Sequence, residues 1–229
     1  MGQMLNIVNQ LHRRTARDYV GRMADDKIPC SGVAREFGPD YWDGDRRYGY
    51  GGYKYDGRWS VVAKALVERY GLKDDAKILD VGCGRGFLLH EFQKLLPKCT
   101  VSGFDISEYG LATAKEEVKP HLFLHDARDP FPFPDREFDL VISLNALHNL
   151  LPQDVVKSLK EIERVGVNKY VVVETFHDAE ELFNLQCWAL TCETFLRPES
   201  WRWLHDLAGY TGDYEYIRFE APLAHTQAA

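Results

Sequence analysis

The stretch ILDVGCGRG, residues 78–86 of this 229-residue sequence, decides the fold. Its opening apolar residues are typical of a buried strand, and three glycines at alternate positions follow them. Phe87 then begins a segment with helical spacing. Glycines between a strand and a helix allow a tight turn and a close approach of ligand to backbone. The alternative is a strand-to-helix turn that holds no ligand.

The loop differs from a dinucleotide-binding fingerprint at one position. That fingerprint has its third glycine five residues after the first, where this chain has Phe87. In addition, Asp80 stands two residues before Gly82, where a carboxylate repels a pyrophosphate and attracts an ammonium group. We therefore expect a ligand with an amino-acid end and disfavour a nicotinamide-dependent oxidoreductase.

Strands and helices alternate along the rest of the chain. Apolar or alternating runs predict strands at 77–81, 100–104, 122–124, 138–143, 170–174 and 214–219. Helical spacing predicts helices at 3–24, 61–70, 87–96, 108–118, 154–165 and 199–207. Residues 28–59 look irregular, and 187–195 fit either a strand or part of a lid. This order predicts a parallel sheet with helices on both faces.

Acidic residues stand where the second and third of these strands end. Asp105 has the position of a carboxylate that accepts hydrogen bonds from a ribose diol. Asp126 and Ala127 follow the third strand, where an acceptor can meet an adenine amino group. Each aspartate alone reads equally well as a turn or cap residue. Together with Asp80, they favour one ligand with amino-acid, ribose and adenine parts.

These motifs together resemble the class I S-adenosylmethionine-dependent methyltransferases. The resemblance covers roughly residues 60–220 and is carried by ILDVGCGRG (78–86), FDIS (104–107) and DARDPFPFPDREFDLVISLNALHNL (126–150). It implies a Rossmann-like three-layer α/β/α sandwich with a mostly parallel seven-stranded sheet that contains one antiparallel strand. It also implies S-adenosyl-L-methionine as cofactor and S-adenosyl-L-homocysteine as product. The sequence departs from the family in showing one strand, not two, after the last helix.

The resemblance also implies a role for each residue of the cofactor site. The methionine end is expected against Asp80, Gly82, Cys83, Gly84 and Gly86, the ribose against Asp105, the adenine against Ile106, Asp126 and Ala127, and the sulfonium near Asn145.

The segment RRYGYGGYKYDGRW, residues 46–59, combines many aromatic rings with glycines. The resemblance suggests a lid here, so we divide the chain into an N-terminal helix and aromatic lid (1–59) and a methyltransferase domain (60–229). Tyr53 and Arg58 are expected to close over the cofactor, with Arg58 on its carboxylate, and Tyr50 to face the substrate. The alternative is that these rings pack the N-terminal helix onto the sheet.

Two histidines are candidate general bases for a hydroxyl acceptor. His148 lies three residues after Asn145, and His177 lies just past the fifth strand. An ordinary imidazole pKa near 6.5 suits this task at neutral pH. Glu174 is expected to bind the acceptor, and Asp43 and Asp45 are further candidates from the lid. The alternative for His148 is a structural role at a helix start.

Composition narrows the partners and the location. A net charge of −7, without a basic stripe, disfavours a nucleic-acid partner. No apolar run approaches membrane-spanning length, and no secretory signal is recognised, so we expect a cytoplasmic protein with reduced cysteines. No metal-ligand spacing stands out, so no metal is expected. A homodimer is left open.

The substrate class rests on a second resemblance. Residues 40–59 (DYWDGDRRYGYGGYKYDGRW) and 199–220 (ESWRWLHDLAGYTGDYEYIRFE) resemble methyltransferases of bacterial surface-polysaccharide gene clusters. We therefore expect O-methylation of a small molecule, a sugar or sugar nucleotide, with His148 as general base. The alternatives are N-methylation of a small amine or natural product, and a non-catalytic partner subunit with the methyltransferase fold.

Overall fold

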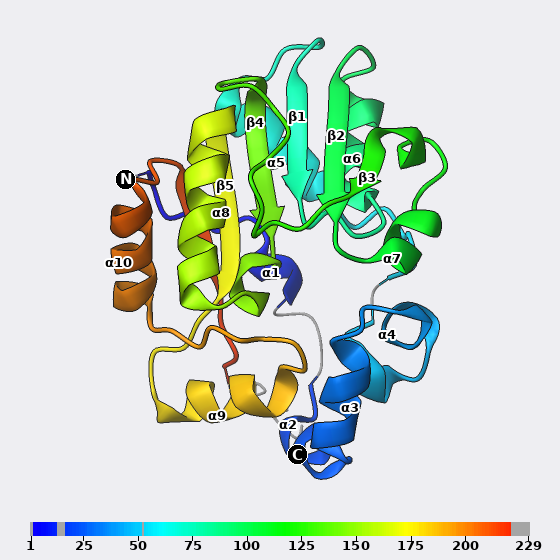
Figure 1. Cartoon of the computed structure of the whole chain (residues 1–229), viewed down its shortest axis with the longest axis vertical. Helices are drawn as coiled ribbons and strands as arrows, with labels where there is room; N and C mark the ends of the chain where they lie inside the picture. The colour runs from blue at the N-terminus through cyan, green and yellow to red at the C-terminus, as the bar shows by residue number, and fades with distance from the viewer. Residues whose placement is uncertain (1, 13–16, 52, 221–229) are drawn as a thin grey trace, which may run out of the picture.

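The computed structural model describes residues 2–12, 17–51 and 53–220, and its centre is a parallel β-sheet (Figure 1). The strands are β1 (Lys77–Val81), β2 (Thr100–Asp105), β3 (Leu122–Leu124), β4 (Phe138–Leu144), β5 (Gly166–Glu174) and β6 (Asp213–Ile217). Their order is β3-β2-β1-β4-β5-β6, and each neighbouring pair is parallel. The order reverses between β1 and β4, which is where open α/β sheets bind ligands.

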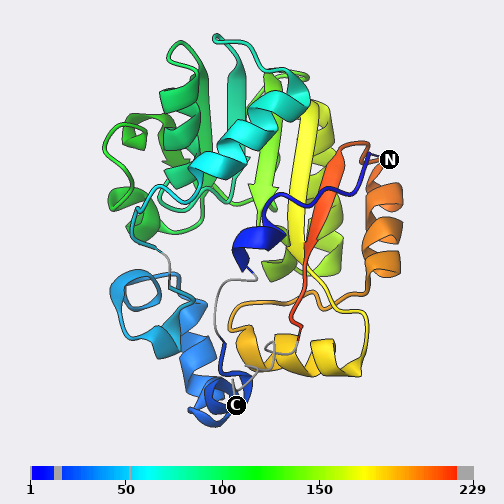
Figure 2. The same ribbon diagram turned by 180° about the vertical axis from the view of Figure 1, so that it is seen from behind.

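Helices cover both faces of the sheet, as Figures 1 and 2 show from opposite sides. α5 (Ser60–Tyr70) and α6 (Phe87–Leu95) lie on one face, and α8 (Pro152–Val165) and α10 (Pro198–Ala208) lie on the other. Alternate residues of β5 point into the two cores: Tyr170 and Val172 pack with α5 and α6, and Val171 and Val173 with α8 and α10. The predicted three-layer Rossmann-like sandwich is therefore confirmed.

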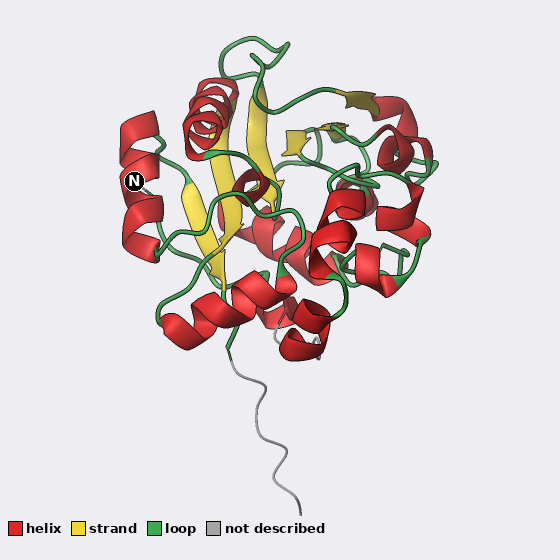
Figure 3. Ribbon diagram, turned by 60° about the horizontal axis from the view of Figure 1, so that its bottom comes forward, coloured by secondary structure: helices red, strands yellow, loops and turns green. Residues whose placement is uncertain are grey.

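Short helices gather below the carboxyl ends of the strands (Figures 1 and 3). They are α1 (Asn9–His12), α2 (Tyr19–Ala24), α3 (Lys27–Ala34), α4 (Pro39–Asp43), α7 (Glu108–Ala112), α9 (Ala179–Trp188) and the 3₁₀ turns η1 (Arg46–Tyr48) and η3 (Leu147–Asn149). A further 3₁₀ turn, η2 (Lys119–His121), precedes β3 at its amino end. Arg22 donates to the Trp188 carbonyl at 2.9 Å and Lys27 to the Cys187 carbonyl at 2.8 Å. These bonds fix the N-terminal helices against α9. Within the described residues, no helix has the length and apolar character needed to cross a membrane.

The N-terminal segment is not the single helix predicted for residues 3–24. Instead, Met4 forms a parallel bridge with Tyr214 of β6, and in the described part of this segment (residues 3–12 and 17–24) the helices are α1 and α2. The buried Glu215 carboxylate explains the difference, because it accepts from the main-chain N–H groups of Ile7 (2.7 Å) and Asn9 and from the Tyr170 hydroxyl. These contacts hold the chain extended along the outer edge of the sheet.

Other expectations also need correction. The described part of the sheet has six strands in parallel pairs, not seven with one antiparallel, and the N-terminal segment lies against the outer edge of β6. Residues 221–229 lie outside the described residues. The stretch expected to be irregular contains α3, α4 and η1, whose few turns are too short for a clear helical period. The helix expected at 108–118 ends at Ala112, and α9 was not foreseen.

We predict that Glu215→Gln destabilises the protein. One amide oxygen cannot replace a carboxylate that serves three donors, and the amide nitrogen would face an N–H group. Urea denaturation should show a loss of about 1–3 kcal/mol in the free energy of unfolding. Glu68→Gln, on the exposed face of α5 with Lys64 at 4.0 Å, is the matched control and should change little. Equal stability of the two variants would contradict the role given to Glu215.

Candidate functional site

A cavity of about 760 Å³ opens where the carboxyl ends of the strands meet the short helices. This volume lies in the usual range for small-molecule sites. The cavity brings together most of the residues singled out from the sequence: Tyr50, Tyr53, Arg58, Asp80, Gly82, Cys83, Gly84, Asp105, Ile106, Asp126, Ala127, Asn145, His148 and Glu174. Gly86 and His177 are not among its lining residues.

The glycine loop folds back over the end of β2. The main-chain N–H groups of Gly82 and Cys83 both donate to the Phe104 carbonyl, at 2.9 and 3.0 Å. Gly84 has φ of +53°, and a Cβ there would lie 2.9 Å from the Trp42 ring. Gly86 has φ of +69°, and a Cβ there would lie 2.7 Å from Val118. The lack of a side chain at Gly84 thus leaves room for the Trp42 ring, and at Gly86 it leaves room for Val118 behind the loop.

Two carboxyl groups stand side by side at the loop. The Asp105 carboxylate accepts from the main-chain N–H groups of Gly84 (2.8 Å) and Ser107 (2.9 Å). Asp80 is 5% exposed, and its carboxyl group has no hydrogen bond to any described residue. Burial, together with the charge of Asp105, raises the pKa of Asp80 to about 8. A cationic group bound in the cavity would stabilise the ionised form of Asp80.

Further polar atoms in the cavity wall are buried without a partner in the described part of the chain. Among them are Asn145 Oδ1, at the end of β4, and His125 Nε2, just after β3. Asn145 has φ of +58°, and its Nδ2 lies 3.1 Å from His12 Nε2. Unpaired buried polar groups are costly, so these atoms, with Asp80, fit a polar and partly cationic ligand.

At the end of the cavity where the adenine is expected, Asp126 has a partner that the sequence did not indicate. The Asp126 carboxylate is already paired with the guanidinium of Arg128, whose Nε lies 2.9 Å from both carboxylate oxygens. This pairing lowers the pKa of Asp126. His125, which the sequence reading missed, offers the unpartnered polar atom at this end.

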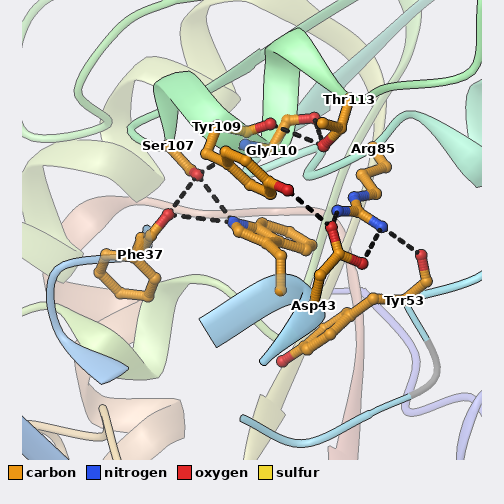
Figure 4. A network of polar contacts seen from close by, with 9 residues as sticks. Phe37, Asp43, Tyr53, Arg85, Ser107, Tyr109, Gly110 and Thr113 are labelled. Atoms are coloured by element: carbon orange, nitrogen blue, oxygen red, sulfur yellow. Dashed lines mark hydrogen bonds and ion pairs between the residues drawn. The ribbon is translucent and has the colours of Figure 1, made fainter. Parts of the chain in front are cut away.

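Helix α4, in the segment predicted to include a lid, is fastened over the glycine loop by a polar network (Figure 4). The Trp42 indole N–H donates to Ser107 Oγ at 2.8 Å and to the Phe37 carbonyl at 3.1 Å. Asp43 pairs with Arg85, and its carboxylate also accepts from the Tyr109 hydroxyl at 3.0 Å. The indole and this charge pair together join α4 to both the glycine loop and α7.

The predicted lid residues line the cavity, with their polar groups already engaged. The Tyr50 hydroxyl accepts from the main-chain N–H groups of Leu190 (2.6 Å) and Thr191 (3.1 Å). Tyr53 lies with its ring 4.7 Å from that of Trp42, and burial raises its pKa to about 12. Arg58 is half-exposed and paired with Asp56. The tyrosines therefore form a wall, and Arg58 lies at the rim.

The His148 ring is held on both sides by Glu174. Its Nδ1 accepts from the Glu174 main-chain N–H at 3.3 Å, and its Nε2 lies 3.5 Å from Glu174 Oε2. Burial lowers the pKa of His148 to about 3, and His12 acts in the same direction. Burial raises the pKa of Glu174 to about 7. The stronger base of this pair is therefore the carboxylate, and the imidazole positions it.

The other candidate bases lie elsewhere. His177 is at the protein surface, where its Nδ1 contacts Glu181 Oε2 at 3.0 Å. Asp43 belongs to the lid network, and the Asp45 side chain caps η1 through the Arg47 N–H. None of these three lines the cavity.

Several cavity residues were missed from the sequence, among them His12, Arg46 and Trp188. His12 and Trp188 carry no motif and reach the site through the folding of distant segments. Arg46 lies in the aromatic stretch but had no visible partner to mark it. Among the described residues, no cluster of three or more metal-ligating side chains occurs. All five cysteines are free.

Comparison with known proteins shows which families resemble this chain. Residues 78–168 match a family described as Methyltransferase domain. The chain is 35% identical over 112 residues to the demethylmenaquinone methyltransferase of Chlorobaculum tepidum, covering 48% of this chain and 45% of that protein. It is 35% identical over 118 residues to the ajmaline N-methyltransferase of Rauvolfia serpentina (48% and 39%). It is also 30% identical over 146 residues to a mitochondrial arginine-hydroxylase of Rattus norvegicus (62% and 41%).

Solved structures share the fold. A structure named as a methyltransferase of Bacillus halodurans aligns with a TM-score of 0.53 at 20% identity, covering 64% of this chain and 68% of that one. A chain from a Haloferax volcanii complex of a methyltransferase activator with a methyltransferase aligns with a TM-score of 0.55 at 19% identity (85% and 77%). The chain spans less than half the length of the three curated relatives named above.

We predict that Asp43→Asn loosens the lid. The change leaves the buried Arg85 guanidinium without its charged partner, although Asp43 itself is partly exposed. Hydrogen exchange of the α4 amides should become about fivefold faster, which corresponds to about 1 kcal/mol. Asp74→Asn, which removes a surface pair with Lys98 at 3.1 Å, is the control and should leave α4 unchanged. Unaltered protection of α4 in Asp43→Asn would show that the charge pair does not fasten the lid.

Proposed function

Because the chain carries a class I S-adenosylmethionine-dependent methyltransferase domain, we propose that it methylates a hydroxyl group of a small molecule. The observation that carries the proposal is the unpaired, buried Asp80 carboxyl beside Asp105 at the glycine loop. A chain that bound no cationic ligand there would gain nothing from such a group. When bound, S-adenosylmethionine supplies a methyl group on positively charged sulfur.

The residues present fit this cofactor. In the proposal, Asp80 holds the ammonium of the methionine end, and Gly82, Cys83 and Gly84 lie beneath it. Asp105 takes the ribose hydroxyls, because its oxygens retain lone pairs beyond the two main-chain bonds. Ile106, half-exposed in the cavity wall, packs on the adenine, and His125 offers its free ring nitrogen. Asn145 faces the middle of the cavity with its unpaired oxygen.

Glu174 is the proposed general base, in place of His148. A base that takes a hydroxyl proton near neutral pH needs a pKa near 7. Glu174 meets this requirement, whereas both ring nitrogens of His148 already face Glu174 groups. His148 then serves as a positioning residue that fixes the carboxylate. His177 has no role in this proposal.

The acceptor class follows from the aromatic wall. Tyr50, Tyr53 and Trp188 offer flat faces suited to a sugar ring, so a sugar or sugar nucleotide is the first class to test. The similarity to an N-methyltransferase keeps a small amine as the second candidate. The lid assigned to residues 1–59, the cytoplasmic location and a homodimer remain predictions.

Cofactor binding should release protons. Near pH 7 the Asp80 carboxyl group is mostly protonated before the cofactor binds, because its pKa is about 8. A bound ammonium lowers that pKa, so S-adenosylhomocysteine should displace up to one proton per site. Calorimetric titrations in two buffers of different ionisation enthalpy measure this release.

The Asp80→Asn variant should bind S-adenosylhomocysteine about 10–100-fold more weakly and release no such proton. Asp74→Asn, a surface change, should behave as wild type. If wild type shows no binding, and no thermal stabilisation with ligand in excess, the chain is better explained as a non-catalytic partner subunit.

We predict that Glu174→Gln lowers kcat by about 10²–10⁴-fold for a hydroxyl acceptor, with little change in cofactor affinity. The ionised form of Glu174 is the active base, so wild-type kcat should fall about tenfold per pH unit below pH 7 and level off above it. Glu180→Gln, exposed on α9, is the control. A full loss in His148→Gln with Glu174→Gln active would reverse the assignment, and activity of both variants would favour an amine acceptor.

A further inference from the structure

Three guanidinium groups surround one indole in the cavity. The guanidinium carbons of Arg17, Arg22 and Arg46 lie 5.4, 4.6 and 5.1 Å from the centroid of the Trp188 ring. We call these four residues the Trp188 cluster. The three guanidinium groups place positive charge at this part of the cavity, in a protein whose net charge is −7.

Arg46 differs from the other arginines of the cavity wall. Four of them are paired with carboxylates, in the pairs Arg35–Glu193, Arg58–Asp56, Arg85–Asp43 and Arg128–Asp126. The Arg46 guanidinium has no hydrogen bond or ion pair to any described residue. Its capacity for a bidentate anion is therefore unused.

The contacts of Arg22, the neighbour of Arg46 in the cluster, bring no carboxylate to Arg46. Arg22 donates to the main-chain carbonyls of Trp188 (2.9 Å), Arg46 (3.1 Å) and Gly49 (2.9 Å), which are neutral acceptors. The pKa of Arg46 is lowered by burial first and also by the charge of Arg17. Arg22 is thus held in place by neutral groups, and the Arg46 guanidinium keeps its hydrogen-bonding edge for a ligand.

The backbone leaves room for this guanidinium. Gly51 has φ of +71°, and a Cβ there would lie 2.7 Å from Arg46 Nη1. A side chain at position 51 would therefore press on the group, and this close approach keeps Arg46 at the cavity wall.

The Trp188 cluster lies at the acceptor end of the cavity. The Tyr50 ring lies 6.4 Å from Trp188 and 5.4 Å from the Arg22 guanidinium carbon. The charges of Arg17 and Lys27 are close enough to Glu174 to lower its pKa against the effect of burial. The cofactor residues Asp105 and His125 stand at the ends of β2 and β3, on the other side of β1.

We propose that Arg46, seated on the Trp188 cluster, binds an anionic group of the acceptor, a phosphate or a carboxylate, so that the methylated molecule is itself an anion. The statement that this anion belongs to the methyl acceptor rests on the proposed function. The anion site itself rests on the geometry of the cluster.

Inorganic pyrophosphate is the probe, titrated calorimetrically with and without S-adenosylhomocysteine. Wild type should bind it saturably, and Arg46→Gln should bind it at least tenfold more weakly. Arg46→Lys, which keeps the charge without the planar fork, should fall between them. Arg47→Gln is the matched control, because Arg47 pairs with Asp25 and Asp26 outside the cavity, and should bind pyrophosphate as wild type does.

Titration with acetate and with inorganic phosphate distinguishes the two sources of the anion. If wild type prefers one of these anions and Arg46→Gln loses the preference, that anion identifies the group on the acceptor as a carboxylate or a phosphate.

Three results would overturn the proposal. The first is an absence of saturable anion binding in wild type, and the second is anion binding that Arg46→Gln leaves unchanged. The third is a tenfold loss of S-adenosylhomocysteine affinity in Arg46→Gln, since Arg46 would then hold the cofactor carboxylate. If wild type fails to bind S-adenosylhomocysteine but binds pyrophosphate through Arg46, the proposed methyl transfer fails while the anion site stands.

Discussion

The Phe104 carbonyl at the end of β2 accepts from both Gly82 and Cys83, and the rest of the site depends on this pair of bonds. They pull the glycine loop across the sheet, so that Gly84 can donate to Asp105. Asp80 then becomes buried near Asp105 with no hydrogen-bond partner among the described residues. A polar arrangement of this kind persists because the two cores on either side of β1 fix the strand ends.

The short N-terminal helices form a cap over these strand ends, which is held by an apolar cluster of Cys30, Ala34 and Leu190 and also by polar contacts to distant segments. Glu215 anchors the N-terminal segment to β6, Arg22 and Lys27 anchor α2 and α3 to α9, and Trp42 fastens α4 to Ser107. Such contacts release more readily than a hydrophobic core, because water can replace each of them at small net cost. A cap built in this way suits a site that must admit and release its ligands.

The sequence was sufficient to predict the strands and to select residues that the fold brings to one cavity as the candidate cofactor site. The strand at 77–81, the glycine loop and Asp105 carry local signals, since their spacing and residue types fix both structure and chemistry. The N-terminal helix was misjudged because the period of Leu5, Val8 and Leu11 reflects packing on the sheet edge. The acceptor half was largely invisible: Arg46 and Trp188 are far apart in sequence, and only the fold brings them together. His148 shows the same limit, because its burial and its two contacts with Glu174 could not be read from its position.

The two buried carboxyl groups at either side of β4 illustrate how one physical cause can serve two tasks. Burial raises the pKa of Asp80, at the end of β1, and that of Glu174, at the end of β5. Asp80 has a second carboxyl beside it, so a bound cation relieves its cost and it becomes a binding group. Glu174 has a neutral imidazole beside it, and the charges of Arg17 and Lys27 partly offset its burial, so it ionises near neutral pH. A carboxylate in that state can exchange a proton with a neighbouring hydroxyl, and the positive cluster beyond it favours an acceptor that brings its own negative charge.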